Sequence, residues 1–248
     1  MTSPRIDLLR PAPAAELSDE QLRELYTPGT GSWLRVNFIS SVDGAVTVDG
    51  LSGGLGGPAD HRVFDLLREL CDVVLVAAGT VRAEGYGPMV VAAESVAVRE
   101  ARGLAPQPVF AIVSASLDLD PASRIFTEAP VRPIVVTTES SPADSRRALA
   151  AVADVIVCGT HALDAGMLVR ELHARGLAGI HCEGGPSLFG ALLAADVVDE
   201  LCLTVSPLLV AGDAGRIASG SLPDARSLHL AHVLASGDEL LLRYLRRR

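Results

Sequence analysis

The sequence predicts a three-layer α/β fold in which helices cover both faces of a mostly parallel sheet and a C-terminal antiparallel hairpin follows. Strand-like and helix-like segments alternate from residue 33 onward, as in chains that build parallel sheets. Short, continuous apolar runs such as 73–78 and 109–113 are typical of strands buried on both faces. The tail changes character, because two strand-like segments flank the turn residues Gly237 and Asp238.

Each predicted element has a local reason. Ser18 and Gln21 have capping-box spacing, which predicts one short helix in an N-terminal arm, residues 1–32. Pro58 suits the first turn of a helix that continues to residue 70. Further helices are expected at 142–152, 165–175 and 186–194, and strands at 36–41, 73–78, 109–113, 134–137, 155–158, 179–182, 201–206, 227–235 and 239–245. Residues 33–248 therefore read as one domain, with 99–107 as its most mobile connection.

Composition restricts the partners. Hydrophobic residues make up 49% of the chain, enough for a sizeable core, while aromatic residues make up only 4%. A formal net charge of −9 disfavours nucleic acid and anionic membranes as partners. We see no secretory signal and no apolar stretch long enough to span a bilayer, so the sequence predicts a cytoplasmic protein with a small-molecule partner.

The side-chain inventory excludes several chemistries. All 21 basic residues are arginine, which rules out the lysine of a P-loop and any enzyme Schiff base, including that of pyridoxal phosphate. The four cysteines stand singly and are expected to be reduced and buried. His181 and Cys182 are strand neighbours that point to opposite faces, so we expect no metal site there.

Three segments follow predicted parallel strands, at the sheet edge where ligands of such folds bind: 40–58, 79–87 and 183–190. The first is rich in glycine and could close over a substrate. In the second, Thr80 is placed as the N-cap of a short helix. In the third, Gly184 and Gly185 precede a helix starting at Pro186, which forms an anion site suited to a cofactor phosphate, or else a plain strand-to-helix turn.

Two charged residues near this edge are candidates for substrate contacts. Glu183 ends a strand in a chain without lysine, and ligand hydrogen bonding explains it better than packing does. Arg68 could hold a substrate phosphate bidentately, or could be a solvated arginine in a salt bridge.

Taken in order, these motifs resemble one family. Ser-x-Asp-Gly at 41–44, Leu-Leu-Arg at 66–68, Gly-Thr-Val-x-x-Glu at 79–84, Glu-Gly-Gly-Pro-Ser-Leu at 183–188 and Asp-Glu-Leu at 199–201 resemble the riboflavin-biosynthesis reductases. The resemblance runs from about Trp33 to the C-terminus. It implies a dihydrofolate-reductase-like fold and NADPH-dependent reduction of the ribosylamino side chain of a 5-aminouracil ribosylamine 5′-phosphate to ribitylamino.

The resemblance also implies roles for individual residues. Ser52 and Arg68 match substrate contacts, and Glu183 matches a substrate-side carboxylate near the reacting carbon. In the mechanism that we expect, Glu183 or a bound water supplies the proton. Cofactor contacts are implied for Ile39, Gly54, Thr80, Glu84, Gly184, Gly185, Pro186, Ser187, Leu188, Phe189 and Gly190.

The chain departs from the family pattern at two points. Asn37 stands where bifunctional bacterial members have a lysine, so acid catalysis at this position is in doubt. The zinc-deaminase motif of those members is missing.

Dihydrofolate or pterin reduction, or NADPH binding without turnover, remain alternatives. The Gly-x-Ser-x-Gly match at 50–54 is a poor nucleophile elbow, because glycines and Pro58 postpone the helix.

A homodimer is expected. Leu240, Leu242 and Tyr244 alternate along the last strand, and the resemblance implies pairing through this region.

Overall fold

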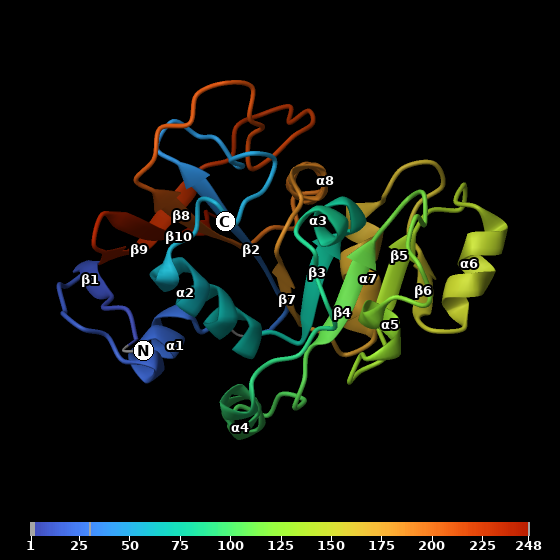
Figure 1. The fold of residues 1–248 in the computed structure, drawn as a ribbon, viewed down its shortest axis with the longest axis horizontal. Coiled ribbons are helices and arrows are strands. Elements are labelled where there is room, and N and C mark those ends of the chain that lie inside the picture. Colours follow the sequence, from blue (N-terminus) through green and yellow to red (C-terminus); the bar gives the residue numbers. More distant parts are fainter. Residues whose placement is uncertain (1–2, 30, 248) are drawn as a thin grey trace.

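The computed structural model describes residues 3–29 and 31–247; residues 1–2 and 30 of the predicted arm and residue 248 of the predicted domain lie outside them. Its centre is a ten-stranded sheet of order β1-β9-β10-β8-β2-β7-β3-β4-β5-β6 (Figure 1). The strands are β1 (Asp7–Arg10), β2 (Trp33–Ser41), β3 (Val73–Ala77), β4 (Val109–Val113), β5 (Ile134–Thr137), β6 (Asp154–Val157), β7 (Gly179–Cys182), β8 (Glu200–Ser206), β9 (Leu228–Ser236) and β10 (Glu239–Arg246). From β8 to β6 neighbouring strands are parallel, whereas β10 is antiparallel to β8 and β9. The predicted fold class is confirmed.

Helices cover both faces of the sheet. They are α1 (Asp19–Tyr26), α2 (Pro58–Glu69), α3 (Ala78–Ala83), α4 (Ala93–Ala101), α5 (Arg124–Thr127), α6 (Ala143–Ala150), α7 (Ala165–Ala174) and α8 (Pro186–Ala194). Successive residues of β3 point to opposite faces: Val73 and Leu75 pack with α7 and α8, whereas Val74 and Val76 pack with α3, α5 and α6. This double burial explains the continuous apolar run of the strand.

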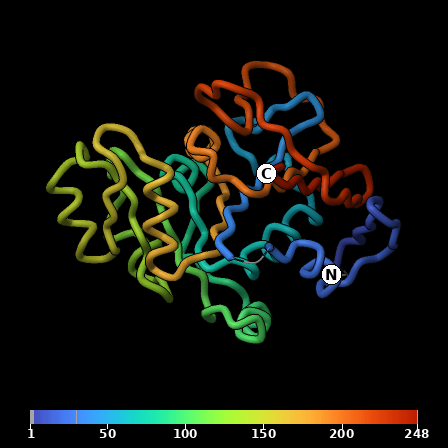
Figure 2. Tube along the Cα trace, turned by 180° about the vertical axis from the view of Figure 1, so that it is seen from behind, coloured from blue at the N-terminus to red at the C-terminus, as the bar shows by residue number. Residues whose placement is uncertain are grey.

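The N-terminal arm is part of the sheet, which its sequence did not reveal. The capping box of Ser18 and Gln21 is confirmed, with hydrogen bonds of 2.9 and 3.2 Å. However, β1 precedes this helix and pairs with β9, so the arm lies against the C-terminal strands (Figure 2). Leu22 and Tyr26 of α1 are buried against α2 and this end of the sheet.

A buried ion cluster joins the arm to the sheet. Glu200 accepts from Arg35 Nε at 2.6 Å and from Arg243 Nη2 at 2.8 Å, and both arginines also donate to carbonyls at the end of α1. The indole of Trp33 donates to the same carboxylate at 2.9 Å. Burial would raise the pKa of Glu200, but the two arginines lower it to about 2. The cluster therefore carries one carboxylate and two guanidinium groups at neutral pH.

The segment 99–107, for which the sequence predicts mobility, is hydrogen-bonded to the rest of the chain at both ends. Arg99, on a helix the sequence did not predict, is fully buried and donates to the carbonyls of Arg68, Cys71 and Ala105 at 2.7–2.8 Å. Gln107 accepts from the Val91 amide at 2.8 Å. Within the described residues, no helix has the length and apolarity needed to cross a membrane.

Candidate active site

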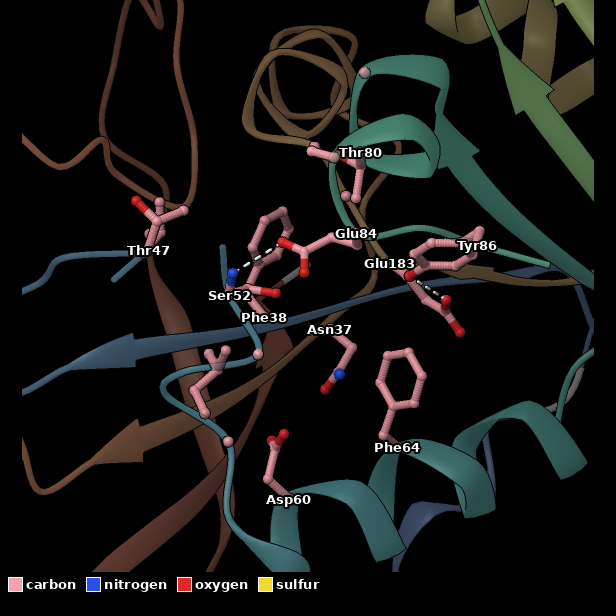
Figure 3. Close-up of a pocket in the computed structure, with 18 of the residues that line it drawn as sticks. Asn37, Phe38, Thr47, Ser52, Asp60, Phe64, Thr80, Glu84, Tyr86 and Glu183 are labelled. Atoms are coloured by element: carbon pink, nitrogen blue, oxygen red, sulfur yellow. Dashed lines mark hydrogen bonds between the residues drawn. The ribbon is translucent and has the colours of Figure 1, made fainter. Parts of the chain in front are cut away.

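A cavity of about 510 Å³ lies at the carboxyl ends of β2, β7 and β3, the edge that the sequence predicted. The glycine-rich segment after β2 and the helix α2 form its opposite wall (Figure 3). Its lining includes Asn37, Phe38, Ile39, Thr47, Ser52, Asp60, His61, Phe64, Arg68, Thr80, Glu84, Tyr86, Glu183, Gly184, Gly185 and Pro186. The three predicted segments therefore meet at one site.

The diglycine turn forms one wall of the cavity. Gly184 has a φ of +110°, which only glycine adopts without strain, and its peptide bond to Gly185 is cis. A Cβ on Gly185 would lie 2.6 Å from Thr80 Oγ1, so the hydroxyl of Thr80 faces the turn across a space that any side chain would fill. Helix α8 starts directly afterwards, with Pro186 in its first turn.

Thr80 is not the N-cap that we predicted. Helix α3 begins earlier, at Ala78, and no side chain caps it. The apolar strand β3 passes into the helix without a break, which leaves the Thr80 hydroxyl on the cavity side.

Glu183 is the centre of a polar cluster with a fully buried side chain. Arg68 grips it bidentately, with Nε and Nη2 at 2.6 and 2.8 Å from the two carboxylate oxygens. Tyr86 Oη donates to the same carboxylate at 2.8 Å (Figure 3). His181 Nε2 lies 3.5 Å away, a long contact, and neither ring nitrogen of His181 has a hydrogen-bond partner among the described residues.

These contacts fix the charge states. Burial alone would raise the pKa of Glu183, but the hydrogen bonds and charge of Arg68 lower it to about 2. Burial and the charge of Glu183 raise the pKa of Tyr86 well above its usual range. Burial lowers the pKa of His181, so the imidazole is neutral. At neutral pH Glu183 is thus a carboxylate and an acceptor, and Tyr86 a donor.

The glycine-rich segment is hydrogen-bonded across the cavity to the residue that follows α3. The amide of Ser52 donates to Glu84 Oε1 at 2.8 Å, which joins two residues that the resemblance assigned to substrate and cofactor (Figure 3). Ser52 stands well after β2 and before Pro58, without the strand–serine–helix geometry of a nucleophile elbow. A Cβ on Gly54 would lie 3.2 Å from Val48 Cβ. Gly54 is exposed and is not among the residues lining the cavity.

The Ser-x-Asp-Gly motif has a structural role. Asp43 accepts from the amide of Ala211 at 2.8 Å and from that of Val210 at 3.2 Å, and its other partner is the Ser41 hydroxyl. These hydrogen bonds lower the pKa of Asp43, the Ser41 contact most. The motif therefore joins the loop after β2 to the loop after β8.

The remaining predicted cofactor residues divide into two groups. Ile39 lines the cavity. In contrast, Leu188 and Phe189 are buried in the hydrophobic core, and a Cβ on Gly190 would lie 1.7 Å from the carbonyl oxygen of Ser219. The Ser187 hydroxyl lies 3.2 Å from that of Ser219. At the start of α8 the exposed Ser187 can face a ligand, whereas the amide of Phe189 is already bonded to the carbonyl of Gly185 at 3.0 Å.

Comparison with known proteins gives a consistent result. Residues 32–242 match the family model described as "RibD C-terminal domain". The chain belongs to this family. It is 28% identical over 217 residues to the 2,5-diamino-6-ribosylamino-4(3H)-pyrimidinone 5′-phosphate reductase of Methanothermobacter thermautotrophicus, covering 84% of this chain and 95% of that one. The Aquifex aeolicus protein of the same name is 31% identical over 179 residues, 70% of this chain and 75% of its own.

A solved structure supports the same assignment. The pyrimidine reductase-like protein of Corynebacterium diphtheriae superposes with a TM-score of 0.85 at 28% identity, covering 94% of this chain and all of that one. The riboflavin biosynthesis reductase of Saccharomyces cerevisiae shares the fold, with a TM-score of 0.64 at 19% identity over 89% of this chain and 93% of that one. The RibD C-terminal fold thus extends over nearly the whole chain.

Sequence reasoning missed several polar residues of this RibD-type cavity, among them Tyr86 and Asp60. Tyr86 stands in a turn after α3, and no local pattern predicts that its hydroxyl reaches Glu183. Asp60 is an acidic residue in the first turn of α2, where acids are common for helix-dipole reasons. The only signal was the position of Asp60 close after the glycine-rich segment.

Proposed function

We propose that this protein is an NADPH-dependent reductase that converts the ribosylamino side chain of a 5-aminopyrimidine ribosylamine 5′-phosphate to ribitylamino. The observation that carries the proposal is the cavity between the diglycine turn and α2, in a chain whose relatives are reductases of this substrate class. The turn offers a place for a dinucleotide, and the far side has room and polar groups for a small heterocycle.

The residues at the turn fit a nicotinamide dinucleotide. The space between Gly185 and Thr80, which a Cβ would fill, suits the close approach of a diphosphate to backbone. The first amides of α8 lack partners within the helix and would donate to that diphosphate, with Thr80 as a further donor. Ile39 and Glu84 would contact the rest of the cofactor. Ser187 and Leu188 would contribute their amides, and the exposed Ser187 also its hydroxyl. The amide of Phe189 already donates to the carbonyl of Gly185 at 3.0 Å, and Gly190 packs against Ser219.

NADPH, when bound, supplies the hydride for the reaction. The open-chain imine of the substrate gains this hydride at its carbon and a proton at its nitrogen, which gives the amine. Glu183, as a carboxylate held by Arg68 and Tyr86, stabilises positive charge on the imine nitrogen. Because its pKa is about 2, the proton comes from a water that Glu183 orients and not from Glu183 itself. Asn37 can hold the substrate by its amide but cannot replace an acid.

Arg68 has two duties in this proposal. Its Nε and Nη2 bind Glu183, and its remaining nitrogen, Nη1, is the donor that we assign to the substrate phosphate. The guanidinium of Arg68 stacks on the ring of Phe64 in a cation–π contact, with Cζ of Arg68 4.3 Å from the ring centroid. Ser52, at the mouth of the cavity, would close over the bound substrate.

The proposal includes a homodimer in the cytoplasm. Leu240, Leu242 and Tyr244 form the more accessible side of β10, as an interface would require. Cys71, Cys158, Cys182 and Cys202 are all free and buried, which suits a reducing compartment. A mass measurement in solution tests the dimer.

The test of function is NADPH oxidation by the purified protein. With the phosphorylated ribosylaminopyrimidine we expect steady-state loss of the reduced nicotinamide absorbance. A protein that binds NADPH and consumes none with this substrate would instead be a non-catalytic binder.

A further inference from the structure

Asp60 faces the cavity without a cationic partner. It stands in the first turn of α2, and its carboxylate points toward the side of the cavity where Asn37 lies (Figure 3). Within the described chain the half-buried Asp60 forms no ion pair, unlike the buried carboxylate of Glu183. A Cβ on Gly56 would lie 2.8 Å from Asp60 Oδ2, so the segment leaves room for this carboxylate.

The surroundings of Asp60 favour a ligand that brings hydrogen-bond donors. Its side-chain partner is the buried hydroxyl of Thr204 on β8. The titratable groups that face it are His61 on the same helix and Glu239 on β10, whose carboxylate accepts from the amides of Gly57 and Asp60. Burial raises the pKa of Asp60, against the effect of the Thr204 hydroxyl. Within the described part of the chain, the Thr204 hydroxyl thus offsets only part of the desolvation of this carboxylate.

One edge of an aminopyrimidinone supplies such donors. In a 2-amino-4(3H)-pyrimidinone the ring N3–H and the C2 amino group lie side by side, as two N–H groups of a guanidinium do, and a carboxylate accepts both. In the corresponding uracil the C2 amino group is replaced by a carbonyl oxygen, an acceptor that a carboxylate repels. A charged acceptor at this place therefore discriminates between the two rings.

We propose that Asp60, oriented by Thr204, binds the N3–H and C2-amino edge of the substrate ring and selects 2-aminopyrimidinones over uracils. The inference rests on the proposed function and deepens it, since it names the ring that the reductase accepts. It replaces the 5-aminouracil expected from the family resemblance with the 2,5-diaminopyrimidinone. Dihydropterins carry the same edge, so Asp60 by itself would accept them too.

The decisive variant is Asp60→Asn. The asparagine amide keeps one acceptor, for N3–H, and gains one donor, which suits the uracil carbonyl. We expect kcat/KM for the diaminopyrimidinone ribosylamine phosphate to fall at least about tenfold, the loss of one hydrogen bond to a charged group. The ratio of kcat/KM for the uracil to that for the diaminopyrimidinone should rise by more than this. Thr204→Val should shift the ratio in the same direction by a smaller factor.

Ring-only probes make the result independent of turnover. Calorimetric titration with 2,5,6-triaminopyrimidin-4-one and 5,6-diaminouracil compares the two edges without ribose or phosphate. The wild type should prefer the first probe and Asp60→Asn should lose or invert that preference. Asp144→Asn, the same change in the first turn of α6 with a highly exposed side chain, is the matched control and should change neither binding nor turnover. Unchanged NADPH binding shows that each variant is folded.

The outcomes separate this inference from the proposed function. If the wild type reduces the phosphorylated substrate and Asp60→Asn keeps the wild-type ratio of the two kcat/KM values, the role of Asp60 is overturned and the proposed function stands. If no ribosylaminopyrimidine is reduced, the proposed function fails, and the ring probes still decide whether Asp60 reads the C2 amino group. Turnover of dihydrofolate in place of the phosphorylated substrate would assign the same edge to a pterin.

Discussion

At the scale of single residues, the site depends on how two of its carboxylates, Glu183 and Asp60, are partnered. Glu183 has Arg68 and Tyr86 as donors and is ionised at any physiological pH. Among the described residues, Asp60 has the Thr204 hydroxyl as its side-chain partner and keeps acceptor capacity for a ligand. Two carboxyl groups of similar intrinsic acidity therefore take different tasks: one holds charge near the reacting centre and the other recognises a ring.

The Arg68–Glu183 pair predicts a stability effect. Arg68→Met leaves the fully buried Glu183 without its main counter-charge, and we expect a loss of about 3 kcal/mol in the free energy of unfolding. The double variant Arg68→Met/Glu183→Gln removes both charges and should recover part of this loss. Urea unfolding checks both values. Losses that simply add would show that the two side chains do not interact energetically.

Residue roles were the part least accessible from sequence. The sequence indicates Glu183 and Arg68 as separate candidates, but no local pattern shows that they pair, because 115 positions separate them. Tyr86 and Asp60 lie in a turn and a first helical turn, where their residue types have ordinary explanations. Hydrogen bonds across the sheet edge depend on tertiary geometry that local patterns do not encode.

At the scale of elements, the link between β7 and α8 determines where the cofactor can bind. The turn between them has no side chain, which leaves the Thr80 hydroxyl and the first amides of α8 accessible from the cavity. The strands and helices that create this geometry were largely predictable, because apolar runs, Pro58 and Pro186 mark their positions. The short edge strand β1 was not predictable, since its four residues are half-exposed or exposed and buried and exposed positions do not clearly alternate.

Gly185→Ala tests this element. The new Cβ would lie 2.6 Å from Thr80 Oγ1 and project into the diphosphate space, so NADPH binding should weaken by at least about tenfold. Fluorescence titration with NADPH measures the change without turnover. Gly79→Ala is the matched control: no atom lies within 4 Å of its added Cβ, so the substitution tests a glycine of the same wall without a clash. Equal affinity of Gly185→Ala and the wild type would contradict the assignment of the turn.

At the scale of the whole molecule, buried charges join distant parts of the chain. The Arg35–Glu200–Arg243 cluster connects the arm to β2, β8 and β10, and Asp43 joins the two loops beside the cavity. These links could not be predicted, since the sequence of the arm indicates one helix and no residue with which the arm would pack. The overall layering could be predicted, because it follows from the alternation of strands and helices and from the burial of the parallel strands on both faces.

This charge pattern predicts how stability depends on pH. Burial, with the charge of Arg243, lowers the pKa of His232 to about 4, so its contribution is lost as pH falls from about 6.5 toward 4. The pKa of Glu183 and that of Glu200 are each about 2, so their contributions are complete above about 4.5 and are lost as pH falls toward 2. Urea unfolding at several pH values should show stability falling slightly below pH 6.5 and steeply below 4.5.

A variant localises the acid-sensitive step. Glu200→Gln should be less stable at pH 7 and show a shallower decline between about pH 4.5 and 2 than the wild type. Stability that is constant or rises from pH 7 to pH 3 would contradict these charge assignments.

The most direct test of the central claim traces the transferred hydrogen. NADPH carrying deuterium at the transferable position of the nicotinamide is incubated with the protein and the diaminopyrimidinone ribosylamine phosphate, and the product is analysed by mass spectrometry and NMR. The account predicts one deuterium on the ribityl carbon bonded to nitrogen. Complete retention of deuterium by the nicotinamide, with the ribosyl group unchanged, would contradict it.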